Sequence, residues 1–291
     1  MESLIKIDKE ALEPLSKVLI ALMDKMEKAA CWVAMPKGKS ANRERAISFY
    51  IKELEEKEDM PPLMKAALIT QARKTLKEYC NITDIVHLAI RQLNEDAKPQ
   101  DIDDDWFSYF YEHAKNINLS EAKILWAKIL ANECNRRSSI PKLLIHILSV
   151  MSLRDAKAFE CLCGFITQDV NSKESAVNLV LIHDFNDDMV INNGLNYELL
   201  RDLEALGLIC QEDDLVCCDE NYSNILKLRY QDMNVLIYAP DEKEPSFPFG
   251  NVMLTNAGLT LSTLIEGKKL EGFLDYLKLY FENLNFTVEI S

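Results

Sequence analysis

The chain has few of the residues that break regular structure. Only eight glycines and nine prolines occur among 291 residues, of which 48% are apolar. Disordered chains have too little apolar surface to form a core, so this composition argues against disorder. We find no internal repeat and no low-complexity tract. The length is sufficient for two domains, and we expect an ordered, mostly helical protein.

Signals for export and membrane insertion are also missing. The first residues, "MESLIKIDKEALEPLSK", lack the basic start, apolar centre and small-residue cleavage site of a secretion signal. No uninterrupted apolar run approaches the roughly 20 residues that span a bilayer. We therefore expect a cytoplasmic protein without a transmembrane segment.

The motifs of common cofactors and catalysts are absent. Neither G-x-x-x-x-G-K-[ST] nor G-x-G-x-x-G occurs, which argues against nucleotide hydrolysis and dinucleotide redox chemistry. The eight cysteines show no C-x-x-C spacing, and we interpret them as small core groups in a reducing compartment. No serine or cysteine has the surroundings of a nucleophile. We predict a non-enzymatic protein without a metal or cofactor.

Charge is divided unevenly along the chain. Residues 1–150 contain 23 basic and 23 acidic residues, whereas residues 151–291 contain 10 and 24, so the second half carries the whole net charge of −14. This division is typical of two domains with different surfaces.

The first half shows the three- and four-residue periodicity of amphipathic helices. One apolar stripe runs from Leu12 to Val33, with Lys25 on the opposite side. Further helices are predicted from the following segments: 42–58, 62–80 after Pro61, 83–97 with Thr83 as N-cap, 120–137 with Ser120 as N-cap, 141–151, and 152–167 with Ser152 as N-cap.

After about residue 175 the pattern becomes that of short strands. The predicted strands are "AVNLVLI", "LVCC", "ILKLRY", "NVLIYA", "NVMLT" and "FTVEI". Helices are predicted at "NYELLRDLEALGLI", which Gly207 ends, at "TNAGLTLSTLI", and at "LEGFLDYLKLYFENL". The order of helix, strand, two helices and wing strands is that of a winged-helix module.

We therefore predict an α+β fold, predominantly α. It comprises an N-terminal amphipathic helical region (1–100), a helical core (101–150), and an acidic winged-helix-like domain with a C-terminal helix and strand (151–291).

An acidic cluster opens the helical core. In "DIDDDWFSYFYEHAK", Asp101, Asp103, Asp104 and Asp105 precede an aromatic group. A calcium loop needs acids at alternating positions, a central glycine and a terminal glutamate, which are missing here. We favour a helix start that Asp103 or Asp104 caps, over a metal site. His113 is expected to be a partly buried packing residue.

Glu133 is the candidate for a buried polar or ligand-binding position. Its helical spacing from Trp126 and Ile129 places the carboxylate at the edge of an apolar face, where it requires a partner. Arg136 and Arg137 are three and four residues further on and are the predicted partners. A structural ion pair is favoured, with ligand binding or catalysis as the alternatives.

Two surfaces are candidates for macromolecular contacts. The predicted recognition helix, "NYELLRDLEALG", carries three acids against Arg201 alone, which disfavours nucleic acid. A basic docking patch of Lys37, Lys39, Arg43 and Arg45 follows the first amphipathic helix. It is either a solvated loop, which we favour, or a contact for an anionic membrane surface or an acidic partner.

Several pieces of the chain resemble an uncharacterised bacterial family. They are Asp105-Trp106 with Phe107 and Phe110, "NINLSEAKILWAKILANE", "LSVMSLRDAKAFECL", "LEALGLI" and "LTNAGLTL". Together they span roughly residues 80–265 and resemble the family catalogued as domain of unknown function 2806. More distantly, they resemble the abortive-infection alpha proteins. Asn132 stands where the family commonly has glycine, and "NRRSSIP" replaces a serine-rich run.

The resemblance implies an architecture and a part in phage defence. With the charge pattern, it favours a bacterial interaction or regulatory protein that binds a protein partner or itself. The alternatives are a winged-helix regulator that binds nucleic acid, and a small-molecule sensor or enzyme with a site near Glu133.

Overall fold

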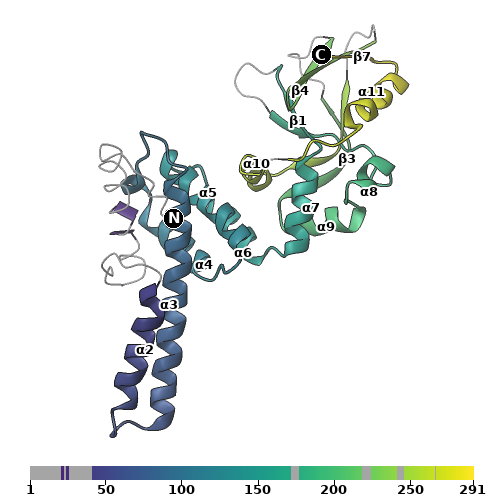
Figure 1. Cartoon of the computed structure of the whole chain (residues 1–291). Helices are drawn as coiled ribbons and strands as arrows, with labels where there is room; N and C mark the ends of the chain where they lie inside the picture. The colour runs from purple at the N-terminus through teal and green to yellow at the C-terminus, as the bar shows by residue number, and fades with distance from the viewer. Residues whose placement is uncertain are drawn as a thin grey trace, which may run out of the picture. The chain divides into compact units, whose positions relative to one another are not determined.

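A computed structural model describes residues 21–22, 24–25, 41–171, 177–217, 224–240, 246–265 and 267–291. The chain forms two compact units, residues 1–149 and 150–291. The first unit contains helices only, and the second combines helices with a sheet, among the described residues (Figure 1). Each unit is described by itself below.

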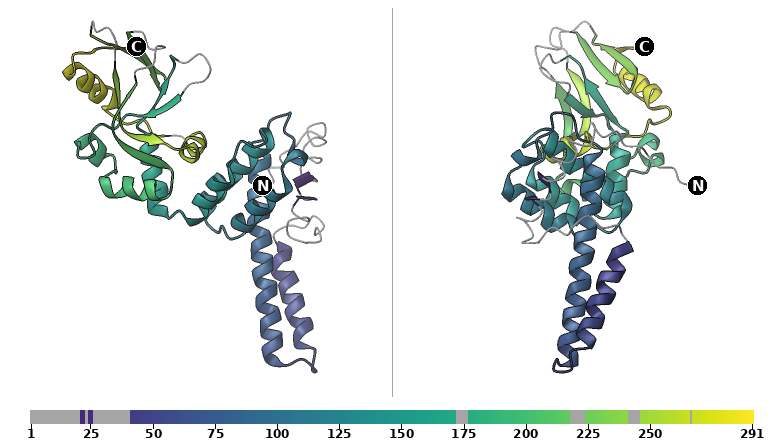
Figure 2. Two further views of the ribbon diagram at one scale, coloured as in Figure 1. Left: turned by 180° about the vertical axis from the view of Figure 1, so that it is seen from behind. Right: turned by 60° about the vertical axis from the view of Figure 1, so that its left-hand side comes forward.

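A helical hairpin dominates the beginning of the first unit. Helix α2 (Ala41–Glu55) lies beside the first half of α3 (Pro62–Ile90) in both Figure 1 and Figure 2. As predicted, Pro61 and Pro62 begin the second helix. The predicted break at Thr83 is wrong, because the Thr83 hydroxyl donates to the carbonyl of Tyr79 at 2.8 Å, within a continuous helix.

The remainder of α3 packs against a core of shorter helices. These are the 3-10 turn η1 (Pro99–Asp101), α4 (Asp104–Ala114), α5 (Ser120–Asn135) and α6 (Lys142–Val150). Their buried faces meet in an aromatic cluster of Trp106, Phe107, Phe110 and Trp126. Ser120 is the first helical residue and not the N-cap, a position that Leu119 occupies.

Most of the predicted helix from Leu12 to Val33 lies outside the described residues. Residues 21, 22, 24 and 25 are helical, and Leu22 is buried as expected. Lys25 is also buried, contrary to the prediction, and its ammonium group bonds the Ile102 carbonyl and the Asp104 carboxylate. The lysine therefore ties this segment to the start of α4.

The second unit begins with α7 (Leu153–Cys163). Ser152 caps it as predicted, in a reciprocal capping box with Asp155. The predicted extension of this helix to residue 167 is wrong. The chain leaves the helix at Gly164, whose carbonyl accepts a 3.0 Å bond from the Tyr230 hydroxyl, and residues Ile166–Asp169 form a strand instead.

In the described residues of this unit, the sheet has seven strands, and every pairing in it is antiparallel. The strands are β1 (Ile166–Asp169), β2 (Val177–Val180), β3 (Ile209–Cys217), β4 (Ile225–Tyr230), β5 (Met233–Tyr238), β6 (Phe247–Leu254) and β7 (Thr287–Ile290). Their order across the sheet is β3-β6-β2-β1-β4-β5-β7. All six predicted strands are present, and β1 was not predicted.

Four further helices of the described ranges accompany the sheet. They are α8 (Asp188–Asn192), which was not predicted, α9 (Tyr197–Ala205), α10 (Asn256–Ser262) and α11 (Phe273–Asn283). Helix α9 packs against α7 and β3, α10 lies beside β6, and α11 beside β7 (Figure 2). Gly207 has the left-handed φ of 76° predicted for the residue that ends α9.

The fold is therefore α+β, with more residues in helices than in strands, as predicted. In the described ranges, no helix combines the length and apolar character needed to cross a bilayer.

Candidate functional site

The connection between α5 and α6 is built around Glu133. This carboxylate is 2% exposed and accepts hydrogen bonds from the backbone N–H groups of Ser138, at 2.7 Å, and Ile140, at 3.0 Å. The Ser139 hydroxyl adds a longer contact of 3.5 Å. Backbone donors can satisfy a buried carboxylate, so Glu133 holds the following loop in place.

The predicted ion pair of Glu133 with Arg136 or Arg137 is wrong. Both arginines are exposed, and in the part of the chain that the structure describes neither forms a salt bridge with this carboxylate. The loop folds back because Ser138 adopts a left-handed φ of 59°, which turns its N–H toward Glu133. The arginine side chains are thereby left on the outer side of the loop.

A second hydrogen bond that holds the loop in place comes from α4. The Trp106 indole N–H donates to the Ile140 carbonyl at 2.8 Å, so both polar backbone groups of Ile140 are bonded. Trp106 is stacked on Phe110, with ring centroids 5.3 Å apart, and Phe110 contacts Trp126. The loop is therefore fixed from α4 and from α5, which favours the structural interpretation of Glu133.

The acidic cluster before α4 is the start of a helix, as predicted. The Asp103 carboxylate caps α4 by accepting the Trp106 N–H at 2.8 Å, and Asp104 and Asp105 occupy the first turn. Within the described ranges, no group of three or more histidine, cysteine or acidic side chains could hold a metal ion.

His113 is partly buried, as expected. Its Nδ1 lies 2.8 Å from the Tyr109 carbonyl, and its ring meets the edge of His146 with centroids 6.5 Å apart.

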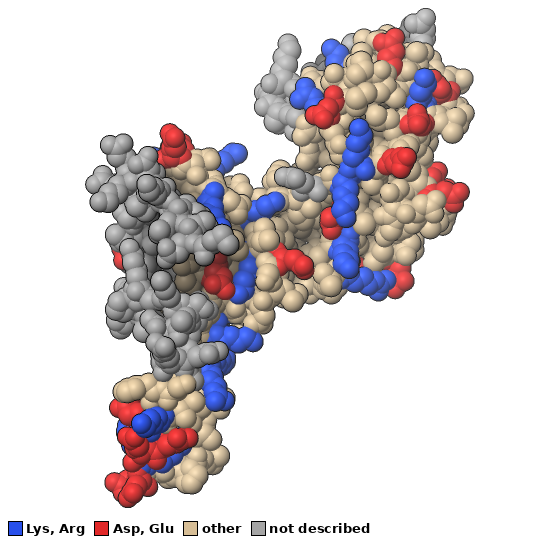
Figure 3. All heavy atoms as spheres, in the orientation of Figure 1, with Lys and Arg blue, Asp and Glu red and all other residues tan. Residues whose placement is uncertain are grey.

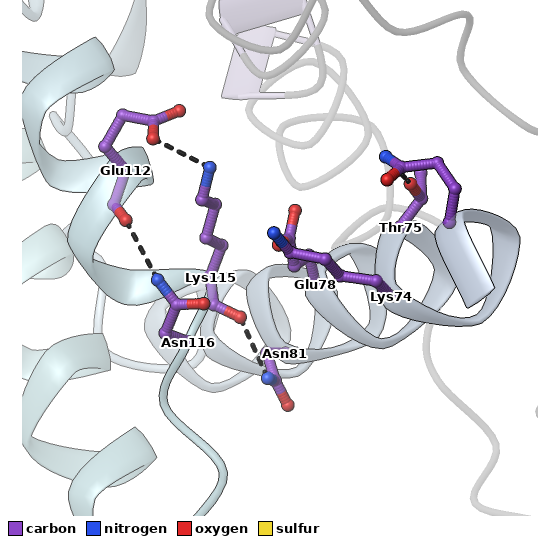
Figure 4. Close-up of polar contacts among 8 residues, drawn as sticks. Lys74, Thr75, Glu78, Asn81, Glu112, Lys115 and Asn116 are labelled. Atoms are coloured by element: carbon purple, nitrogen blue, oxygen red, sulfur yellow. Dashed lines mark hydrogen bonds and ion pairs between the residues drawn. The ribbon is translucent and has the colours of Figure 1, made fainter. Parts of the chain in front are cut away.

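A polar cluster between α3 and α4 was not predicted (Figure 4). Asn81, buried in the middle of α3, donates to the Lys115 carbonyl at 2.9 Å and so caps the end of α4. The Lys115 ammonium group pairs with Glu112 at 2.7 Å. Burial, with Glu78 and Glu112 nearby, raises the pKa of Tyr111 to about 12, so this phenol stays protonated. The cluster therefore joins two helices.

The exposed face of α9 carries the acids noted in the sequence. Glu198 and Asp202 project from it and share Arg154 of α7, at 3.1 and 3.8 Å. Arg201 pairs with Glu204 of the same helix at 2.7 Å. Tyr197, 56% exposed, begins the helix and lies against Phe185. Every arginine close to this face is thus already paired with an acid.

The basic docking patch cannot be located as a unit. Lys37 and Lys39 lie outside the described residues, as do the side chains of Arg43 and Arg45, although the backbone of both arginines belongs to α2.

Comparison with known proteins gives one match. Neither a curated protein nor a solved structure is similar to this chain at a significant level. The model of the family described as "Protein of unknown function (DUF2806)" matches residues 69–278, which is more than two thirds of the chain and includes the Glu133 loop and α9. The chain therefore belongs to this family of proteins of unknown function.

Proposed function

We propose that this chain is a non-enzymatic interaction or regulatory protein of the bacterial cytoplasm, which acts by contacting another protein through the acidic face of α9. The first unit serves for docking or self-association. The resemblance of its motifs to abortive-infection alpha proteins favours a part in phage defence.

The arrangement of the second unit supports a winged-helix core. When β1, β4 and β5, which lie between them in the chain, are left out, α7, β2, α8, α9, β3 and β6 follow the order of helix, strand, two helices and two wing strands. The three strands are adjacent in the sheet, in the order β3-β6-β2. In this assignment α9 occupies the position of the recognition helix, and β1, β4, β5 and β7 extend the wing sheet.

The single observation that carries the proposal is the charge of α9 in that position. Phosphate groups require clustered lysine and arginine side chains, whereas Glu198 is 73% exposed and Asp202 44%. Duplex DNA would bring its phosphates against these acids. An exposed tyrosine beside carboxylates instead suits a protein partner, because tyrosine is frequent at the centre of interfaces.

The test compares affinity capture by three full-length proteins expressed in the native host. The proteins are the wild type, a Glu198→Lys/Asp202→Lys variant, and a Glu95→Lys/Asp96→Lys control with the same change of charge in the first unit. We expect a defined partner to be retained by the wild type and the control and lost by the α9 variant. Folding should be little affected, since exposed ion pairs contribute little to stability.

Binding to a DNA duplex at low salt provides the opposite outcome. If the wild type binds duplex at micromolar concentration, with an affinity that falls steeply as salt rises, the protein is a nucleic-acid-binding regulator and the proposal is wrong.

A further inference from the structure

The α2–α3 hairpin separates its charges along its length. Its free end, here called the acidic end, consists of Glu53, Glu55, Glu56, Glu58 and Asp59, with Lys52 and Lys57 among them. All of these side chains are exposed. Acidic atoms accordingly gather at the lower end of the hairpin in Figure 3.

The opposite charge lies further along α3. From Pro62 to Lys77 the helix contains no acid, and its exposed cations Arg73, Lys74 and Lys77 form what we call the basic end. With a rise of 1.5 Å per residue, the basic end lies about 20 Å from the start of α3. No ion pair joins the acidic end to the basic end in the part of the chain that the structure describes.

This separation is too large for the two ends to neutralise each other within one chain. At physiological ionic strength, charges on the surface are screened beyond about 8 Å. Each end keeps an excess of one charge: five acids outnumber two lysines at the acidic end, and the three cations of the basic end outnumber Glu78, which Lys74 meets at 3.9 Å. The excess like charges at each end repel one another. A partner surface with the same charges in reverse order would relieve both repulsions.

Apolar side chains are exposed in the first turns of α3. Leu63 is 83% exposed and Met64 53%, and the small residues Ala66 and Ala67 that follow are exposed as well. Leu63, Ala67, Thr70, Lys74 and Lys77 recur at steps of four and three residues and therefore lie along one side of the helix. The small side chain of Ala67 in this stripe allows another helix to approach closely.

We propose that the first half of α3 packs antiparallel against the same half of α3 in a second copy of this chain. An antiparallel pairing centred near Ala67 places the acidic end of each copy beside the basic end of the other. A two-fold symmetric contact brings the same surface of both copies together, as a self-complementary charge pattern requires. Leu63 is buried at the same time.

This inference names the partner for the self-association part of the proposed function and rests on that part alone. It does not involve α9, so loss of the captured partner and loss of the dimer are separate outcomes. The contact is a single helix stripe about 22 Å long, so the dimer should be weak, with a dissociation constant in the micromolar range.

Sedimentation equilibrium of the full-length protein tests the dimer. We expect the apparent mass to rise with concentration from 33.3 kDa toward twice that value. Raising the salt from about 50 to about 500 mM should weaken association at least tenfold, because the attraction depends on charge. A protein that remains monomeric at about 100 μM in low salt would overturn the proposal.

Charge exchange tests the antiparallel pairing. Glu56→Lys/Glu58→Lys reverses the acidic end, and Lys74→Glu/Lys77→Glu reverses the basic end. Each variant alone should associate at least tenfold more weakly, because like charges then meet at both contacts. An equimolar mixture of the two variants should form a heterodimer about as strong as the wild-type dimer, since each reversed end then meets an end of opposite charge.

Matched controls carry the same charge changes elsewhere in the first unit. They are Glu95→Lys/Asp96→Lys and Arg136→Glu/Arg137→Glu, which alter exposed residues. Circular dichroism verifies that every variant is folded. If the hairpin variants associate like their controls, or if the mixture does not recover the dimer, the proposed pairing is wrong.

Discussion

His183 is the most unusual single residue of the second unit. Its ring is stacked on Tyr280, with centroids 3.5 Å apart, and meets the edge of Phe281. Neither ring nitrogen has a hydrogen-bond partner within the described residues. Burial lowers the pKa of His183 to about 3, so the imidazole is neutral in the folded protein.

The low pKa of His183 predicts a loss of stability in mild acid. Above pH about 6.5 the residue is neutral in both folded and unfolded chains and has no effect. Between pH about 6.5 and its folded pKa of about 3, only the unfolded chain binds the proton. The free energy of unfolding of the second unit should therefore fall by about 1.4 kcal/mol for each unit by which the pH is lowered in this range.

The measurement is chemical unfolding between pH 7.5 and 4.5. Hydrogen exchange of the amides in β4 and β5 is the probe for unfolding of the second unit. His183→Phe keeps an aromatic ring in the stack and removes the titration, so its slope should be shallower by that amount. Equal slopes would mean that His183 titrates normally in the folded protein.

Glu133 should contribute strongly to the stability of the first unit. Glu133→Ala leaves the N–H groups of Ser138 and Ile140 without their acceptor, which should cost about 2–4 kcal/mol. Glu133→Gln retains one acceptor oxygen and should cost about 1–2 kcal/mol. Tryptophan fluorescence during denaturation measures this, because Trp106 and Trp126 belong to the same core.

The control for Glu133 is Arg136→Ala/Arg137→Ala. Because both arginines are exposed, their removal should change the free energy of unfolding by less than about 0.5 kcal/mol. An effect as large as that of Glu133→Ala would mean that the arginines pair with Glu133, as the sequence predicted.

At the scale of the helix and strand, some helix caps were predictable from neighbouring residues, whereas the caps predicted at Thr83 and Ser120 were wrong. The caps at Asp103, Ser152 and Thr255 each bind a backbone N–H three residues away, and the sequence shows both partners. Strand β1 was not predicted, although it pairs with β2, the next strand along the chain, as well as with β4, because a helical pattern runs directly into it. The partners of Glu133 lie only five and seven residues further on, but they are backbone N–H groups, which no residue pattern reveals.

Gly250 and Gly272 form a matched pair of glycines. Both have a left-handed φ, 89° and 76°. A Cβ on Gly250 would lie 2.4 Å from the carbonyl oxygen of Ile182, two residues after the end of β2. A Cβ on Gly272 would meet nothing within 4 Å. The space around the backbone therefore distinguishes them, and the backbone angle does not.

Alanine at these two positions should have very different effects. Gly272→Ala should lower the free energy of unfolding by about 1 kcal/mol, because alanine disfavours the left-handed angle. Gly250→Ala adds a clash with backbone between β2 and β6 and should cost more than about 3 kcal/mol. Thermal unfolding followed by far-ultraviolet circular dichroism compares them. Similar losses for both variants would show that the sheet can shift to make room.

At the scale of the whole molecule, composition was informative and topology was not. The uneven charge of the two halves and the change from helical to alternating periodicity were visible in the sequence, and the α+β class followed from them. The strand order β3-β6-β2-β1-β4-β5-β7 joins strands distant in the sequence, so it could not be read from local patterns. The family match, over residues 69–278, includes parts of both units.

The unbroken course of α3 has a mechanical consequence. The helix is about 43 Å long, and it contains neither an internal proline nor a glycine at which it could bend. Leu63 near its free end and Asn81, which grips the end of α4, are therefore parts of one stiff rod. A force applied at Leu63 is therefore transmitted to the contact with α4, because no bend in the helix can absorb it.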